Sequence, residues 1–349
     1  MQSYLIVLSV SLAVSLILVA TKRWHGRFSF DHTEGVQKFH VTPTPRIGGI
    51  AIFAGMLTAC FVSKGEQRDL LISLMVASVP AFVFGLAEDL TKRVGVTARL
   101  LATMASGAGA CMISGVAINR ADVPVLDTLL TYWPIAVLFT AFAVGGIANA
   151  VNIIDGFNGL SSGTVMIILV ALALISSKHG DSILASHCML LAVSVLGFWL
   201  LNFPLGKIFL GDGGAYFTGF ALAWLAVLLM ARNPSVSPWL VLLASAYPVI
   251  EVIYSVWRRM RYKQPTGAPD SLHMHSLIKT QLILPNLHRL SAPLKNAAVS
   301  PFMWLYAALP ASLAVALSGQ AVWVLVAALI GCVAVYHLVY VKIERTKYS

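Results

Sequence analysis

The sequence predicts an all-α integral membrane protein, a polytopic bundle of about eleven transmembrane helices with catalytic loops on the cytoplasmic side. Apolar residues make up 58% of the 349 residues and charged residues only 11%. Soluble domains usually carry about a quarter charged residues. Apolar segments also recur along the whole chain, and a spanning helix needs roughly 20 mostly apolar residues. We therefore treat residues 1–349 as a single transmembrane domain.

The apolar segments define the expected spans in chain order. These are Ser3–Ala20, Ile47–Val62, Leu70–Ala87, Ala98–Ile118, Pro134–Ala148, Thr164–Ile175, Leu184–Leu201, Ala215–Ala231, Pro238–Val256, Val299–Leu317 and Ala321–Val341. The fifth and sixth are short, so we expect them to be tilted, broken or longer than drawn. A long loop, 257–298, separates the ninth span from the tenth.

The net charge of +10 would suit a nucleic-acid partner, but in a membrane chain it reflects topology. Lys and Arg collect in cytoplasmic loops. On the eleven-span map, nineteen of the 24 Lys and Arg residues lie on one side. The five on the other side are Lys64, Arg68, Arg120, Lys178 and Arg232. This bias places the N-terminus outside and the C-terminus inside, and we expect no nucleic-acid partner.

Acidic side chains gather on the same side as the basic loops. Glu88, Asp89, Asp155 and Asp212 all fall at cytoplasmic ends of expected spans, where a helical bundle could bring them together. Glu251 alone lies within an apolar span, and an intramembrane carboxylate is a functional candidate by default. A hydrogen-bonded structural glutamate is the alternative at that position.

The third cytoplasmic loop, residues 149–163, repeats an amide or carboxylate every three residues. Asn149, Asn152, Asp155 and Asn158 stand among glycines, which permit turns and a close approach of a ligand to the backbone. Helical spacing would place the first three on roughly one face. Helix capping by Asn and Asp is the alternative, but it explains one or two such residues rather than four.

The next loop contains one carboxylate, Asp212, flanked by glycines at the start of an apolar helix. It could be a helix N-cap. Together with the loop 149–163 it could instead provide a hard oxygen ligand for Mg²⁺ on an open site. The Glu88–Asp89 pair adds two carboxylates, followed closely by Lys92, Arg93 and Arg99.

Two histidines and one arginine are also expected on the cytoplasmic side. His273 and His275 form a His-x-His pair in the long loop 257–298. A zinc site is disfavoured, since no cysteine or third histidine stands at ligand spacing. Phosphate contact or proton handling by imidazole fits better. Arg46 stands in a Pro- and Gly-rich segment before the second span and could face a lipid headgroup or a phosphate.

These motifs together resemble the polyprenyl-phosphate N-acetylhexosamine-1-phosphate transferases, of glycosyltransferase family 4 type. The resemblance runs from Pro43 to His275. It rests on Asn149-x-x-Asn152-x-x-Asp155-Gly-x-Asn158-Gly-Leu and Leu210-Gly211-Asp212, with Pro43-Thr-Pro-Arg46-x-Gly-Gly and His273-x-His275 in support. It implies transfer of a sugar 1-phosphate from a UDP-N-acetylhexosamine to undecaprenyl phosphate, with release of UMP. It also implies Mg²⁺ as the cofactor, with Mn²⁺ as an alternative.

The resemblance also implies roles for individual residues. Asn152 and Asp212 are similar to the Mg²⁺ ligands, and Asn158 to the uracil reader, with Phe209 stacking nearby. Asn149 and Asp155 fall in the same site. Asp89, with Glu88, resembles an Asp-Asp pair proposed to deprotonate or position the lipid phosphate. Arg99 and His275, with His273, are similar to contacts to the pyrophosphate, and Arg46 is a candidate substrate-binding residue.

The sequence departs from the family pattern at two positions. Glu88 stands where relatives have Asp, which weakens any role that needs fixed geometry there. Ser276 follows His275 where several members have a further histidine, which favours the O-antigen-initiating (lipopolysaccharide) type of cell wall biogenesis. The phospho-MurNAc-pentapeptide transferase of peptidoglycan synthesis is the alternative branch.

The expected setting is the bacterial cytoplasmic (inner) membrane, with the site facing the cytoplasm and membrane lipid around it. A homodimer is left open. A secondary transporter is the rival from another class, but it would favour ionisable groups near the bilayer midplane and paired repeats. Only Glu251 is expected at that depth, and the sequence shows no convincing internal repeat.

Overall fold

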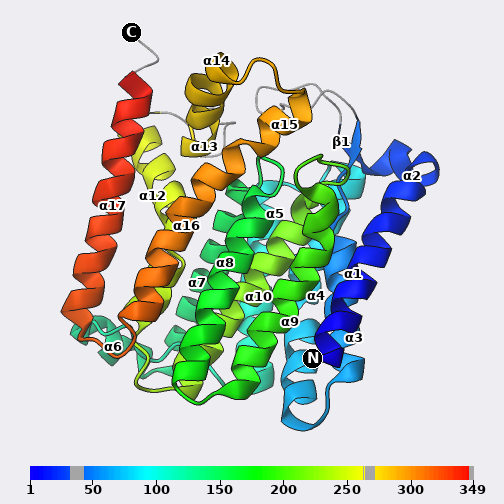
Figure 1. Ribbon diagram of the computed structural model, residues 1–349. Coiled ribbons are helices and arrows are strands. Elements are labelled where there is room, and N and C mark those ends of the chain that lie inside the picture. The colour runs from blue at the N-terminus through cyan, green and yellow to red at the C-terminus, as the bar shows by residue number, and fades with distance from the viewer. Residues whose placement is uncertain (32–42, 262, 264–271, 346–349) are drawn as a thin grey trace.

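The computed structural model describes residues 1–31, 43–261, 263 and 272–345. The chain is helical almost throughout (Figure 1). The strands within the described ranges are β1 (Phe30–Asp31) and β2 (Thr44–Pro45), which pair antiparallel with Phe30 opposite Pro45. The predicted all-α membrane class is therefore confirmed.

The helices are of very different lengths, from single turns to more than seven turns. In chain order they are α1 (Gln2–Ala20), α2 (Lys22–Ser29), α3 (Gly49–Val62), α4 (Gly65–Thr91), α5 (Val96–Ser114), α6 (Pro124–Leu130), α7 (Trp133–Ile153), α8 (Leu160–Lys178), α9 (Ser182–Asn202), α10 (Gly211–Arg232), α11 (Pro238–Ala244), α12 (Ala246–Arg261), α13 (Met274–Leu277), the π-helix η1 (Ile278–Ile283), α14 (Leu284–Asn286), α15 (Ala292–Ala297), α16 (Val299–Ala316) and α17 (Val322–Arg345).

Each of the eleven expected spans is helical in the structure, with two qualifications. Nine helices among the described residues are long and apolar enough to cross a membrane, and the bent pair α11–α12 would make a tenth. The second expected span is α3, whose 14 residues cover only about 21 Å. The ninth is broken at Ser245, where α11 and α12 meet at 82°. The two spans drawn short are full length, since α7 has 21 residues and α8 has 19.

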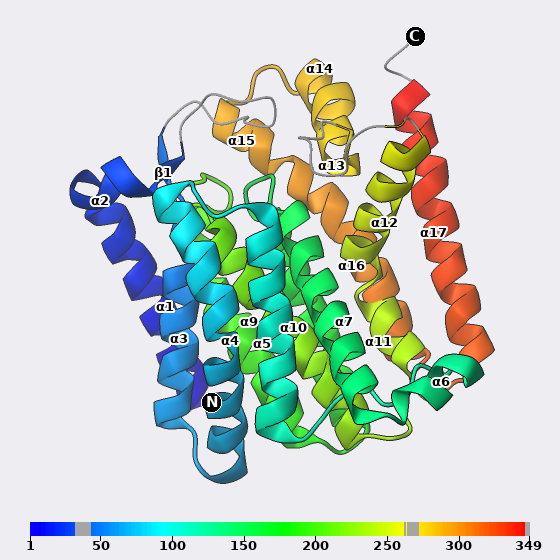
Figure 2. The same ribbon diagram turned by 180° about the vertical axis from the view of Figure 1, so that it is seen from behind.

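Helix α10 runs through the centre of the bundle, packed between α4 and α7 (Figures 1 and 2). Its residues are buried almost from end to end. Small residues allow this close packing. A Cβ added at Gly219 would lie 2.6 Å from the Ala148 Cα of α7. Without a hydrophobic drive between helices in lipid, such close backbone approach is a main source of helix association.

The bundle has two different ends. The loop-rich end carries α2, the two strands and α13–α15, and α17 ends there; α1 begins at the opposite end (Figure 1). At that opposite end the Arg232 guanidinium pairs with Asp181 at 2.6 Å and with Glu66 at 2.7 Å. Arg120 also donates to the Pro234 carbonyl there. Four separate segments that the charge count assigned to one side of the membrane therefore meet at one end.

Candidate functional site

Helices α3, α4 and α10 pack closely together at the start of α10, at the loop-rich end. Gly211 has a φ of +75°, a conformation that favours glycine. A Cβ added at Gly49 of α3 would lie 2.3 Å from the Gly214 nitrogen, and one at Gly85 of α4 would lie 2.6 Å from the Asp212 carbonyl oxygen. The glycines thus bring α3 and α4 against the first turn of α10, which carries Asp212.

Asp89, near the end of α4, caps α10. Its Oδ1 accepts the Asp212 backbone N–H and its Oδ2 accepts the Gly213 N–H, both at 2.8 Å, and the residue is fully buried. A carboxylate at this position satisfies helix donors and complements the helix dipole. The alternative that Asp212 is itself the N-cap is therefore wrong. Asp89 does the capping, which leaves the Asp212 side chain to other partners.

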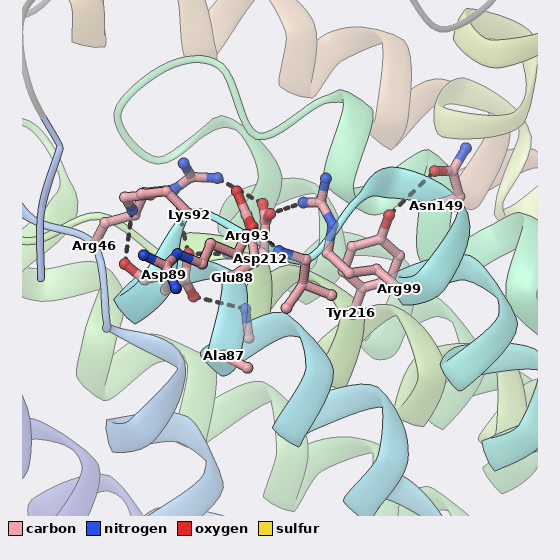
Figure 3. A network of polar contacts seen from close by, with 12 residues as sticks. Arg46, Ala87, Glu88, Asp89, Lys92, Arg93, Arg99, Asn149, Asp212 and Tyr216 are labelled. Carbon is pink, nitrogen blue, oxygen red and sulfur yellow. Dashed lines mark hydrogen bonds and ion pairs between the residues drawn. The ribbon is translucent and has the colours of Figure 1, made fainter. Parts of the chain in front are cut away.

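Two arginines hold the Asp212 carboxylate (Figure 3). Arg46 Nη2 lies 2.6 Å from Asp212 Oδ1, and Arg99 pairs with Asp212 Oδ2. Arg46 also reaches Asp89, with its Nε 3.3 Å from Oδ1. Asp212 is 3% exposed, whereas the Arg46 side chain is 27% exposed. The cluster therefore contains two buried carboxylates balanced by two guanidinium groups, one of which is open to solvent.

A second contact extends this cluster to α7. The Arg99 guanidinium lies over the Tyr216 ring, 5.7 Å from its centroid, and the Tyr216 hydroxyl donates to Asn149 Oδ1 at 3.4 Å. Helices α7, which carries Asn149, and α10, which carries Tyr216, run in opposite directions here (Figure 1). Asn152 is one turn beyond Asn149 and Asp212 one turn before Tyr216, so both are nearer the loop-rich end. Asn152 and Asp212 are therefore at the same level of facing helices.

The segment that joins α7 to α8 is shorter than the sequence suggests. Asn149 and Asn152 are within α7, which ends at Ile153, so the predicted shared face holds for these two. It is wrong for Asp155, which lies in the turn after the helix. Desolvation by the surrounding protein raises the pKa of Asp155 to about 7, against the opposing attraction of Arg46. Asp155 thus belongs to the same electrostatic cluster.

Asn158 and Phe209 are anchored by the protein itself. Asn158 is 4% exposed, and its Nδ2 donates to the carbonyls of Pro204 at 2.9 Å and Pro293 at 3.3 Å. Phe209 uses its backbone to bind the Pro- and Gly-rich segment, donating to the Pro45 carbonyl at 2.8 Å and accepting from Gly48 N–H at 2.9 Å. These contacts explain how both residues are placed. Their roles toward a base remain predictions.

Glu88 has a smaller part than its neighbour. Its Oε2 accepts the Val94 backbone N–H at 2.7 Å, which closes the turn after α4. Lys92, at a φ of +58°, donates its ammonium to the Asp89 carbonyl at 2.7 Å. Desolvation lowers the pKa of Lys92, and Arg46 lowers it further. The acid pair is therefore divided, since Asp89 points into the cluster and Glu88 stabilises a surface turn.

The His-x-His pair meets the α7–α8 turn. The rings of His275 and Phe157 lie edge to face, 5.6 Å apart, and a Cβ added at Gly156 would lie 3.4 Å from His275 Nε2. His273 stacks on His275 with ring centroids 5.1 Å apart and an interplanar angle of 10°. The histidine segment therefore meets the Asn- and Asp-rich turn in the structure. Within the expected loop 257–298, residues 262 and 264–271 are outside the described residues.

Three partners were not expected from the sequence. Tyr216 links Arg99 to Asn149, and Glu251 pairs with His273 through Oε1 and Nδ1 at 3.0 Å. Lys279 donates to Asn296 Oδ1 at 2.6 Å and lies 5.8 Å from the Phe157 ring centroid. Desolvation lowers the pKa of Lys279 to about 8. Only Glu251 gave a signal in the sequence, as a carboxylate within an apolar span.

The donor set is compatible with a magnesium ion. Mg²⁺ is usually bound by one or two protein oxygen ligands, with water and substrate phosphates completing its shell. Asp212 supplies a carboxylate, and Asn152 an amide that has no side-chain hydrogen bond to the described residues. Within the same part of the chain, no three His, Cys, Asp or Glu residues form a closed metal cage. Asp212 and Asn152 together supply the types of ligand that Mg²⁺ accepts.

Comparison with known proteins gives a family. Residues 71–230 match the model of glycosyl transferase family 4. That range includes the acid pair, Arg99, the α7–α8 turn and Asp212, but neither Arg46 nor the His-x-His pair.

Named relatives extend the match beyond that range. A probable undecaprenyl-phosphate N-acetylglucosaminyl 1-phosphate transferase of Bacillus subtilis is 28% identical over 68% of this chain and 66% of its own length. The decaprenyl-phosphate N-acetylglucosaminephosphotransferase of Mycobacterium tuberculosis is 30% identical over 68% and 65%. The undecaprenyl-phosphate alpha-N-acetylglucosaminyl 1-phosphate transferase of Escherichia coli K12 is 25% identical over 78% and 75%. The chain thus spans just under two thirds of the first two relatives, and along residues 71–230 it is similar to glycosyl transferase family 4.

Proposed function

We propose that this protein transfers an N-acetylhexosamine 1-phosphate from a UDP-sugar to undecaprenyl phosphate and releases UMP. The observation that carries the proposal is the meeting of Asp212, its two arginines, the Asn- and Asp-rich turn and the His-x-His pair at one end of a membrane bundle. The names of the relatives, which specify polyprenyl phosphates and N-acetylglucosamine 1-phosphate, support the same chemistry.

In the proposed reaction an oxygen of the lipid phosphate attacks the sugar-linked phosphorus of the UDP-sugar. A new P–O bond forms, the bond to the UMP phosphate breaks, and UMP leaves with the electron pair. A lipid phosphate is ionised near neutral pH, so direct attack needs no enzyme-bound intermediate. Arg46 and Arg99 would bind phosphate oxygens, because guanidinium groups donate two parallel hydrogen bonds to such groups. The histidines would add donors where charge develops.

The ion-pair cluster suits this task. Without substrate, Asp89 and Asp212 balance Arg46 and Arg99, so the buried charges are paired. A pyrophosphate would add negative charge and compete with Asp212 for the two guanidinium groups. We propose that Mg²⁺, or Mn²⁺ in its place, binds Asp212 and Asn152. There it would offset charge on the pyrophosphate and on the departing UMP.

The finer assignments follow from the sequence features. We propose N-acetylglucosamine as the sugar and O-antigen-type polysaccharide initiation as the pathway, because Ser276 interrupts the histidine run expected of the peptidoglycan enzyme. We also propose that the loop-rich end faces the cytoplasm of a bacterial inner membrane, where UDP-sugars are found.

The direct test measures UMP released by the purified protein with undecaprenyl phosphate, Mg²⁺ and a panel of UDP-sugars. We expect release with UDP-N-acetylglucosamine, dependence on both the lipid and the metal, and a lipid-linked product. Turnover of UDP-MurNAc-pentapeptide instead would assign the peptidoglycan branch. No release from any UDP-sugar, in protein that remains monodisperse, would refute the proposal.

A further inference from the structure

Glu251 lies in the broken span α11–α12, six residues after the break at Ser245. It is 1% exposed, and its carboxylate has three neutral or weakly basic donors. Oε1 accepts the Met274 backbone N–H at 2.9 Å and contacts His273 Nδ1 at 3.0 Å, and Oε2 accepts the Tyr336 hydroxyl at 2.9 Å. A carboxylate at such depth is costly unless it is fully hydrogen bonded. Its partners belong to the segment that carries the histidines and to the last helix, α17.

Helix α12, which carries Glu251, and helix α17 also bind the backbone just before the His-x-His pair. Arg258 of α12 donates to the Leu272 carbonyl at 2.7 Å and to the Tyr340 hydroxyl at 2.9 Å. Tyr340 of α17 donates to the same carbonyl at 2.9 Å. Residues 272–274 are therefore fixed from two sides, and both helices that fix them lie at the edge of the bundle next to α16 (Figure 2).

The position of His273 determines that of His275. The two rings are parallel and stacked, and His275 in turn packs on Phe157 and Gly156 of the α7–α8 turn. A carboxylate next to Nδ1 favours a proton on that nitrogen and fixes the ring orientation. The orientation of His273 thus passes to His275 by stacking, and from there to the turn that contains Asp155.

We propose that Glu251 is a positioning residue, which acts through His273 to hold His275 against the α7–α8 turn in the orientation that the phosphate transfer requires. The inference rests on the proposed function. It gives Glu251 a role different from that of a proton carrier, because both of its oxygens are committed to the histidine segment and to α17. It also makes α12 and α17, far from Asp212 in sequence, part of the support of the site.

The test compares Glu251→Gln with Tyr336→Phe. The glutamine keeps the size of the side chain and removes the charge beside His273, whereas the phenylalanine removes one donor from the same carboxylate and leaves the histidine contact in place. We expect Glu251→Gln to lower kcat about tenfold or more with the donor KM changed less than about twofold, since a misplaced His275 would be felt in the transition state. Tyr336→Phe should stay within about twofold of the unmodified protein in both constants.

Glu251→Asp guards against a folding defect, because it keeps the charge one methylene shorter and should recover part of the lost kcat. Equal losses in Glu251→Gln and Tyr336→Phe, or a loss confined to KM, would overturn the proposal.

A second readout does not depend on turnover. Spectra of ¹⁵N-histidine-labelled protein show which ring nitrogen carries the proton, and the His273 signal is assigned by its loss in His273→Asn. We expect a proton on Nδ1 of His273, with the His273 and His275 signals shifted in Glu251→Gln and unchanged in Tyr336→Phe. An unshifted Glu251→Gln spectrum would refute the positioning role. If the unmodified protein releases no UMP from any UDP-sugar, the proposed function fails, and the spectra alone decide the inference.

Discussion

The two ends of the bundle both carry an arginine bound by two acids, yet the two clusters differ in exposure. At the opposite end the side chain of Glu66 is 55% exposed and that of Arg232 is 28% exposed, whereas that of Asp181 is 7% exposed. At the loop-rich end the Asp89 and Asp212 side chains are 1% and 4% exposed. Burial does not change which atoms pair in either cluster, but it changes the free energy that each ion pair costs. Exposed pairs contribute little to stability, whereas buried charges lose several kcal/mol of hydration each, in order of magnitude.

Ion pairs alone therefore do not identify a functional site. The Arg232 cluster joins three segments and is sufficiently explained by structure. In the Asp212 cluster both carboxylates are buried beside glycine backbone, although the Arg46 side chain is about as exposed as that of Arg232. A protein that needed only to join helices there could do so with apolar side chains. Under the proposed function, binding of a charged substrate would account for the buried charges.

The largest expected effect is that of Asp212→Asn. Loss of this carboxylate removes the proposed metal ligand and leaves Arg46 and Arg99 without their shared partner, so UMP release should fall by roughly 10²-fold or more. Asp181→Asn is the matched control, because it also removes a buried acid bound by arginine, but at the opposite end of the bundle. In protein that remains folded, it should leave turnover within about twofold, since distant sites act independently. Initial rates at saturating Mg²⁺ measure both. Near-normal activity of Asp212→Asn would remove it from the metal site.

Sidedness is tested by cysteine labelling of intact cells. Lys207→Cys places an exposed thiol at the loop-rich end, and Ser177→Cys places one at the opposite end. The four native cysteines are buried, so the background should be low. We expect an impermeant thiol reagent to label Ser177→Cys at least about tenfold faster, since the loops rich in Lys and Arg stay inside. Faster labelling of Lys207→Cys would reverse the topology and exclude a cytoplasmic donor.

The tight helix contact at the site is tested by Gly85→Ala. The added Cβ would lie 2.6 Å from the Asp212 carbonyl oxygen, so α4 and α10 must separate. Overpacking of this kind costs about 1–3 kcal/mol, and the melting temperature in detergent should fall by about 3 °C or more. Gly109→Ala, in α5, is the control, because no atom lies within 4 Å of its added Cβ and the melting temperature should not fall. Equal stability of the two variants would contradict the packing.

Sequence patterns predicted what lies within one segment better than what lies between segments. The apolar runs located the spans, and the three-residue spacing placed Asn149 and Asn152 on one helix. The pattern could not show where α7 ends, so Asp155 was wrongly included on the same face. Nor could it show that Asp89 caps a helix 123 positions further along, or that Glu251 meets His273. Those contacts depend on which helix faces pack together, and periodicity carries no information on that choice.

The smallest expected effect on turnover is that of Glu88→Gln, which we compare with Asp89→Asn in the same acid pair. Asp89 binds two buried backbone donors at the start of α10, whereas Glu88 accepts one bond from a surface turn. Unsatisfied buried donors cost about 1–3 kcal/mol, so Asp89→Asn should lower turnover by about tenfold or more. Glu88→Gln keeps an acceptor for Val94 and should lower it by no more than about threefold. Initial rates at several pH values compare the two. An equal or greater loss in Glu88→Gln would mean that Glu88, rather than Asp89, reaches the substrate. The division of the pair between cluster and turn would then have to be reversed.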